Sequence, residues 1–238
     1  MSSLYLVRHG QAGLRHDYDN LSDLGRTQAR LLGQHLAGQQ VRFAAAYCGA
    51  MKRQRETARE VLGAMVAADS PVPELQLDER WNEFDLDAVY QAIAPRLWED
   101  DQEFRAEYDK LRWLLRQEGS SVHRTWTRCD TLIVRAWVEG KYEVPCESWE
   151  AFRTRVSAPI EVLGRFSPDD TVAIFSSATP IAVWIGLALE LSGRHMLRLG
   201  GAMYNAALTT LRAREDDLAL FSFNGTAHLR EPHLRTFR

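Results

Sequence analysis

The residues best suited to chemistry stand near the start of the chain, where Arg8, His9 and Gly10 follow a short apolar run. A neutral imidazole can attack phosphorus when one ring nitrogen is free and the other is fixed by a hydrogen bond. The planar guanidinium of Arg8 matches two phosphate oxygens at once, and Gly10 allows the backbone to turn close to an anion. The triplet therefore indicates a phosphate site with His9 as nucleophile, although three residues alone make a weak motif.

Two expected elements would position this histidine. Residues 3–7 form an apolar run that suits a buried strand leading into a loop, and ligands gather at the carboxyl ends of strands in open α/β sheets. Ser22 can cap a helix that stops at Gly38. Strand and helix patterns then alternate, which favours a mainly parallel sheet covered by helices on both faces. Further strands are expected at 43–47, 171–176, 207–211 and 218–223, and further helices at 53–66, from Trp149 to Leu163 with an interruption at Pro159, and from Pro180 onward.

Residues from about 86 to 146 break this alternation and predict a helical insertion within one domain spanning 1–238. Apolar side chains repeat at helical spacing in two parts of this stretch. It is also rich in tryptophan, and we interpret these rings as packing groups because they fall on helical faces.

The composition limits the classes of partner and location. The chain has 238 residues, of which 45% are apolar and 26% charged, a normal balance for a folded globular enzyme. Its net charge of −3 gives no general attraction for nucleic acid or acidic membranes, so neither partner is expected. No apolar run suits a signal peptide or a membrane span. The three cysteines and seven histidines show no disulfide or metal-ligand spacing, so no metal is expected and the cytoplasm is the expected location.

Longer segments around the triplet resemble the histidine phosphatase superfamily, also called phosphoglycerate-mutase-like. The first reads L-Y-L-V-R-H-G-Q-A from Leu4, followed by L-S-D-L-G and Q-A, and is similar to a bacterial group that opens with R-H-G-Q-A. The second, Y-C-G-A-M-K-R-Q-R-E-T-A from Tyr47, looks like the superfamily's strand-to-helix motif S-x-x-x-R-A-x-Q-T-A. The resemblance implies that Arg53 is a second phosphate-binding arginine, alongside Arg8. It also implies a three-layer α/β/α sandwich with a mainly parallel sheet.

A general acid is expected to protonate the departing oxygen, and a carboxyl group with a raised pKa could do so. The segment W-N-E-F-D from Trp81 resembles the superfamily's L-x-E-x-D or L-N-E-R-H segment, which implies Glu83 as that acid. Glu79, one helical turn away, stays open as an alternative.

The chain departs from the superfamily pattern after the strand expected at 171–176. The superfamily has S-H-G there, with a histidine against the phosphate, whereas this chain has Ser177 in the histidine's place. A hydroxyl can still donate one hydrogen bond to a phosphate oxygen, and the following helix start can add its field. The second imidazole, able to carry charge or relay a proton, is lost.

Three functions follow from the resemblance. The first is a phosphatase that hydrolyses a small phosphoester through a phosphohistidine at His9, with Arg8, Arg53 and Ser177 binding the phosphate and Glu83 as acid. It needs no cofactor. The second is a phosphoglycerate mutase-like phosphotransferase, ranked lower because no Arg-rich clamping segment follows the acid. The third is a catalytically weak member that binds phosphorylated ligands, an alternative that rests on Ser177. The expected partner is a small phosphorylated substrate, and a homo-oligomer is compatible with the sequence.

Overall fold

One sheet organises the molecule. The computed structural model describes residues 2–117, 119–123, 125–160, 165–214 and 217–237. Within them the sheet has the strand order β3-β2-β4-β1-β5-β6. The first four of these strands run parallel to one another, β5 is antiparallel to β1, and β6 is antiparallel to β5. The strands are β1 (Ser2–Arg8), β2 (Ala45–Cys48), β3 (Leu75–Leu77), β4 (Thr171–Ser176), β5 (Leu208–Arg214) and β6 (Asp217–Gly225).

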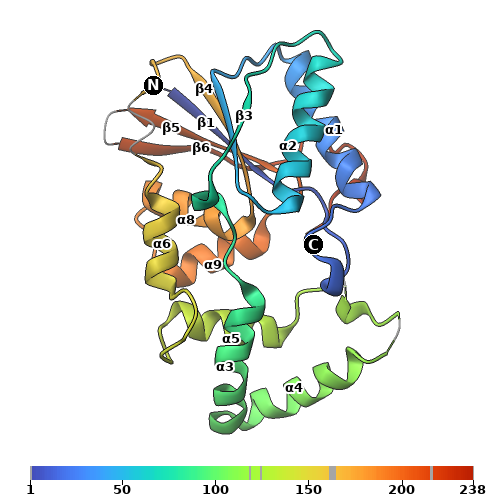
Figure 1. The fold of residues 1–238 in the computed structure, drawn as a ribbon, viewed down its shortest axis with the longest axis vertical. Helices are drawn as coiled ribbons and strands as arrows, with labels where there is room; N and C mark the ends of the chain where they lie inside the picture. The colour runs from blue at the N-terminus through green and yellow to red at the C-terminus, as the bar shows by residue number, and fades with distance from the viewer. Residues whose placement is uncertain (1, 118, 124, 161–164, 215–216, 238) are drawn as a thin grey trace.

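Helices cover both faces of this sheet, as Figure 1 shows. Side chains alternate along β1 because successive residues of a strand point to opposite faces. Leu4 and Leu6 join the core beneath α6, α8 and α9, whereas Val7 joins the core beneath α1 and α2. The expected three-layer α/β/α sandwich with a mainly parallel sheet is confirmed. The helices are α1 (Asp23–Gly38), α2 (Lys52–Val66), α3 (Leu86–Asp100), α4 (Gln102–Leu114), α5 (Arg128–Val138), α6 (Trp149–Ser157), α8 (Ala178–Ala188) and α9 (Gly193–Ala202), with short 3-10 turns η1 (Arg15–Asp17), η2 (Glu79–Trp81), η3 (Ser121–His123) and η4 (Pro232–Leu234).

Local signals explain where several helices begin and end. The Ser22 hydroxyl accepts the Gly25 N–H, as a helix cap should. Helix α6 ends at Ser157, before Pro159, and Leu163, expected in the same core, lies outside the described residues. Pro180 was expected to be the first residue of its helix. In the structure it is the third residue of α8. That position tolerates proline because the N–H groups of the first turn have no partner inside the helix.

The stretch predicted as an insertion contains α3, α4, η3 and α5, which extend away from the sheet in Figure 1. Trp137 packs on Phe84 with ring centroids 4.5 Å apart, as the packing interpretation requires. That interpretation is wrong for Trp113 and Trp126, which are 60% and 50% exposed.

Two features are absent from the residues that the structure describes. No helix is long and apolar enough to cross a membrane. No three His, Cys, Asp or Glu side chains in this part of the chain are grouped so that they could hold a metal ion.

Candidate active site

His9 lies at the carboxyl end of β1, beside the end of β4. Arg8 pairs with Ser176 in the parallel ladder, and the His9 N–H donates to the Ser176 carbonyl at 2.9 Å. The ring is 2% exposed, and its Nδ1 lies 2.7 Å from the Gly10 carbonyl oxygen. Because a carbonyl only accepts, Nδ1 carries the proton and Nε2 keeps its lone pair. Burial, followed by the charges of Arg53 and Arg8, lowers the pKa of His9 well below its usual value, so the ring is neutral at pH 7.

Gly10 is needed for packing against helix α1. A Cβ on Gly10 would lie 2.4 Å from the backbone oxygen of Gly25, a contact that no side chain can make. The Gly10 N–H donates to the Thr57 hydroxyl at 3.0 Å, and that hydroxyl donates to the Arg53 carbonyl at 2.7 Å. Thr57 thus links the His9 loop to the first turn of α2.

Arg53 lies on that first turn of α2 and is 5% exposed. One terminal nitrogen donates to Asp19 at 3.0 Å, and the guanidinium lies 4.9 Å from the centre of the Tyr18 ring. The same ring meets the His9 ring edge-on at 6.1 Å between centroids. Arg53 and His9 are therefore both placed against Tyr18, a residue for which no role was predicted from the sequence.

Arg8 is also buried, but it is held mainly by backbone groups far away in the chain. Its two terminal nitrogens donate to the carbonyls of Met203 and Phe237. Its Nε has no hydrogen-bond partner among the described residues. Burial lowers the pKa of Arg8, and Tyr18 and Glu83 act in the opposite direction. The guanidinium therefore shares the site with His9, and part of its donor set is already engaged.

The structure separates the two candidate acids. Glu83 is partly buried, with one carboxyl oxygen 3.2 Å from the Thr179 N–H at the start of α8 and the other 3.2 Å from the Phe84 N–H. Burial raises the pKa of Glu83, and the charge of Arg53 opposes that shift. Glu79 is exposed on η2, and its carbonyl accepts from Arg155. The geometry thus favours Glu83 over Glu79.

Ser177 follows β4 directly and is 1% exposed, next to the His9 loop. Its hydroxyl accepts a hydrogen bond from the side-chain amide of Gln54 at 2.9 Å. No role was predicted for Gln54 from the sequence. The available signal was its position directly after Arg53, where the resembled motif has alanine.

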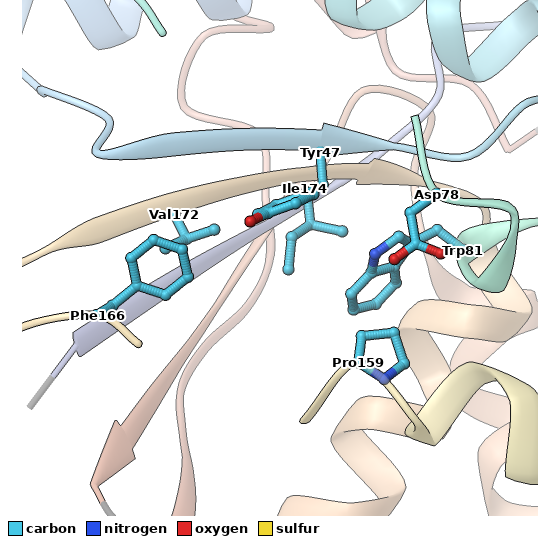
Figure 2. Close-up of a pocket in the computed structure, with 7 residues that line it drawn as sticks. All are labelled: Tyr47, Asp78, Trp81, Pro159, Phe166, Val172 and Ile174. Carbon is cyan, nitrogen blue, oxygen red and sulfur yellow. The ribbon is translucent and has the colours of Figure 1, made fainter. Parts of the chain in front are cut away.

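A separate pocket lies on the sheet face opposite α1 and α2, as Figure 2 shows. The Asp78 carboxylate there pairs with Arg80 at 2.7 Å. None of His9, Arg53, Glu83 and Ser177 lines this pocket. Its lining is mainly apolar and consists of Tyr47, Asp78, Trp81, Pro159, Phe166, Val172 and Ile174.

Solved structures share this α/β architecture over nearly the whole chain. A putative alpha-ribazole-5'-P phosphatase from Escherichia coli is 20% identical with a TM-score of 0.63, covering 95% of this chain and 98% of its own. A phosphoglycerate mutase from Bacillus anthracis is 18% identical with a TM-score of 0.61, covering 96% and 95%. At these identities the likeness shows the fold.

The family follows from the sequence match. The model of the histidine phosphatase superfamily (branch 1) matches residues 4–141 and 131–226, and the chain belongs to this superfamily. It is also 24% identical over 160 residues to the mitochondrial serine/threonine-protein phosphatase Pgam5 of Caenorhabditis briggsae, a match covering 62% of this chain. The chain spans about half the length of that relative, 53%.

Proposed function

We propose that the protein is a phosphatase that hydrolyses a small phosphoester through a phosphohistidine at His9. The observation that carries this proposal is the state of that ring, which is buried and neutral, with Nδ1 fixed by Gly10 and Nε2 free. The small-substrate class is supported by solved relatives whose names describe small phosphoesters and which cover nearly the whole chain. Location in the cytoplasm stays a prediction from the sequence.

The reaction has two steps. The Nε2 lone pair of His9 attacks phosphorus, the ester P–O bond breaks, and the Glu83 carboxyl gives its proton to the leaving oxygen. Water then attacks the phosphohistidine and passes a proton to the Glu83 carboxylate, which releases inorganic phosphate and restores both groups. The phosphoryl oxygens share negative charge during the transfer. They are bound by Arg8, Arg53 and the Ser177 hydroxyl, which stabilise that charge.

Phosphate release from an aryl phosphate, measured with wild type and His9→Ala, tests the proposal. We expect wild-type turnover that disappears in His9→Ala, and an acid-labile phosphoenzyme trapped only with wild type. A panel of small phosphomonoesters beside a phosphoserine peptide tests the substrate class. Equal, background-level release from both proteins would contradict the enzyme proposal.

The loss of the second family histidine favours a second candidate, a module that binds phosphorylated ligands without turnover. In that case both proteins would lack activity while inorganic phosphate still bound to wild type. Net transfer of phosphate between sugar-acid positions, without release, would instead identify the phosphoglycerate mutase-like alternative.

A further inference from the structure

Gln54 is an unusual side chain to find in the interior. It is 0% exposed, on the first turn of α2. Burying an amide without partners costs free energy, so buried glutamines are hydrogen-bonded. The Gln54 Nε2 donates to the Ser177 hydroxyl at 2.9 Å and to the Trp81 carbonyl at 3.2 Å. Both of its N–H groups are therefore used, whereas its buried Oε1 has no hydrogen-bond partner among the described residues.

This contact fixes the direction of the Gln54–Ser177 hydrogen bond. Because the Trp81 carbonyl can only accept, the atom facing it must be the amide nitrogen. The second N–H of that nitrogen then points at the Ser177 oxygen, which accepts. The hydroxyl proton of Ser177 remains to be donated, and no acceptor for it occurs among the described residues.

Gly49 makes the room that this arrangement needs. A Cβ at Gly49 would lie 1.9 Å from the Gln54 Oε1 and 2.8 Å from the Asn82 Oδ1. Asn82 in turn accepts the Ala50 N–H at 2.7 Å. Three of the departures from the resembled motifs are thus linked through Gln54, which lies against Gly49 and donates to Ser177.

Ser177 and Gln54 directly follow residues that contact or belong to the candidate active site. Ser177 follows Ser176, whose carbonyl accepts the His9 N–H at 2.9 Å, and Gln54 follows Arg53 on the same turn of α2. Because the Gln54 amide donates to the Ser177 oxygen, the hydroxyl proton of Ser177 stays available for an acceptor in the site. During phosphoryl transfer, that acceptor would be a phosphoryl oxygen.

We propose that Gln54 is a positioning residue that orients the Ser177 hydroxyl as a donor to the phosphoryl group, in the place of the missing imidazole. The proposal rests on the proposed function, because it assigns the phosphoryl group to the space between His9 and Ser177. Gln54 itself touches no substrate and acts through Ser177. The pair supplies one neutral donor, so it adds no titrating cation beside His9.

A double-mutant cycle with Gln54→Met and Ser177→Ala tests this role. Methionine keeps the length and approximate volume of glutamine but offers no N–H. We expect Gln54→Met to lower kcat about tenfold with little change in KM, and Ser177→Ala to lower it about 10- to 100-fold. The double variant should be no slower than Ser177→Ala alone, because Gln54 has nothing left to orient. Gln34→Met, an exposed site on α1, is the matched control and should leave kcat unchanged.

Binding of inorganic phosphate, measured by calorimetry on wild type, the two single variants and the double variant of the cycle, separates this proposal from the proposed function. If wild type lacks turnover but the cycle shows the same coupling in the Kd for phosphate, the phosphatase proposal falls and the positioning role stands. Three results would each overturn the role of Gln54. The first is that the effects of the two substitutions are independent, and the second is that kcat and Kd are unchanged in Gln54→Met. The third is that wild type shows neither phosphate binding nor turnover. Thermal unfolding of each variant verifies that the comparison is made on folded protein.

Discussion

His9 and Glu83 must be in opposite protonation states for the proposed reaction, and their surroundings provide for this. The attacking ring must be neutral, and burial together with two arginines lowers the pKa of His9. The acid must hold its proton, and burial raises the pKa of Glu83 despite the charge of Arg53. Two neighbouring groups whose pKa values are shifted in opposite directions from their ordinary values are typical of a catalytic site.

These directions predict the pH dependence of kcat/KM. The rate should rise as pH increases through the lowered pKa of His9, because the neutral ring becomes available. It should fall again as pH increases through the raised pKa of Glu83, because the acid loses its proton. In Glu83→Gln the alkaline fall should disappear, with kcat for an alkyl phosphate reduced about 10²- to 10⁴-fold.

The leaving group supplies the control for that variant. An aryl phosphate with a strongly acidic phenol needs little protonation, so Glu83→Gln should slow it much less than the alkyl phosphate. Glu79→Gln, on the exposed neighbour, should match wild type with both substrates. Equal losses on both substrates would mean that Glu83 is not the acid.

At the scale of elements, the first strand, the first helix and the strand before Ser177 were predictable because their signals are local. An apolar run marks β1, the Ser22 cap marks the start of α1, and a second apolar run coincides with β4. Strand β3 was missed because Leu75–Leu77 is only three residues long, too short a run for a strand pattern to be recognised. The Gln54–Ser177 contact joins residues 123 positions apart, so no local pattern could reveal it.

One ion pair links the loop after His9 to the helices predicted as an insertion. Arg15 on η1 donates to both carboxyl oxygens of Asp130 on α5, at 3.0 and 2.9 Å, and the Tyr90 hydroxyl donates to the same carboxylate. The Asp130 carboxylate is fully buried and Arg15 is 19% exposed. Burial alone would raise the pKa of Asp130, but the hydrogen bonds and charge of Arg15 outweigh it and lower the pKa.

Asp130→Asn should therefore lower the free energy of unfolding by roughly 3 kcal/mol, because it leaves Arg15 without its buried partner. The contribution of Asp130 is present above its unfolded pKa and is lost as pH falls through its lowered folded pKa. Denaturant unfolding at pH 7 and under acid conditions measures both effects. Glu139→Gln, which breaks the exposed pair between Arg135 and Glu139 at the C-terminal end of α5, should cost less than about 0.5 kcal/mol. Equal costs for the two variants would exclude a special role for the Arg15–Asp130 pair.

At the scale of the whole molecule, the site depends on segments from both ends of the described chain. Arg8 on β1 donates to the Phe237 carbonyl at 2.7 Å. The Asn205 N–H donates to the Thr236 carbonyl at 2.7 Å, and the Tyr204 and Phe237 rings lie 4.3 Å apart. His9 and Arg53 could be assigned from motifs, whereas this return of residues 234–237 to Arg8 has no sequence pattern of its own.

Gln28 on α1 holds that returning segment in place. Its Nε2 donates to the Leu234 carbonyl at 2.7 Å and to the Thr236 hydroxyl at 2.9 Å, while its Oε1 accepts the Gln11 N–H at 2.8 Å. Gln28→Met keeps the volume and removes all three bonds, so it should destabilise the protein by about 1–3 kcal/mol. Amide hydrogen exchange at residues 234–237 should accelerate, and kcat/KM should fall because Arg8 loses a fixed partner. Gln34→Met on the exposed side of the same helix should leave the stability, the amide exchange and kcat/KM unchanged. Unchanged exchange in Gln28→Met would show that the Arg8 and Asn205 contacts suffice to hold the segment.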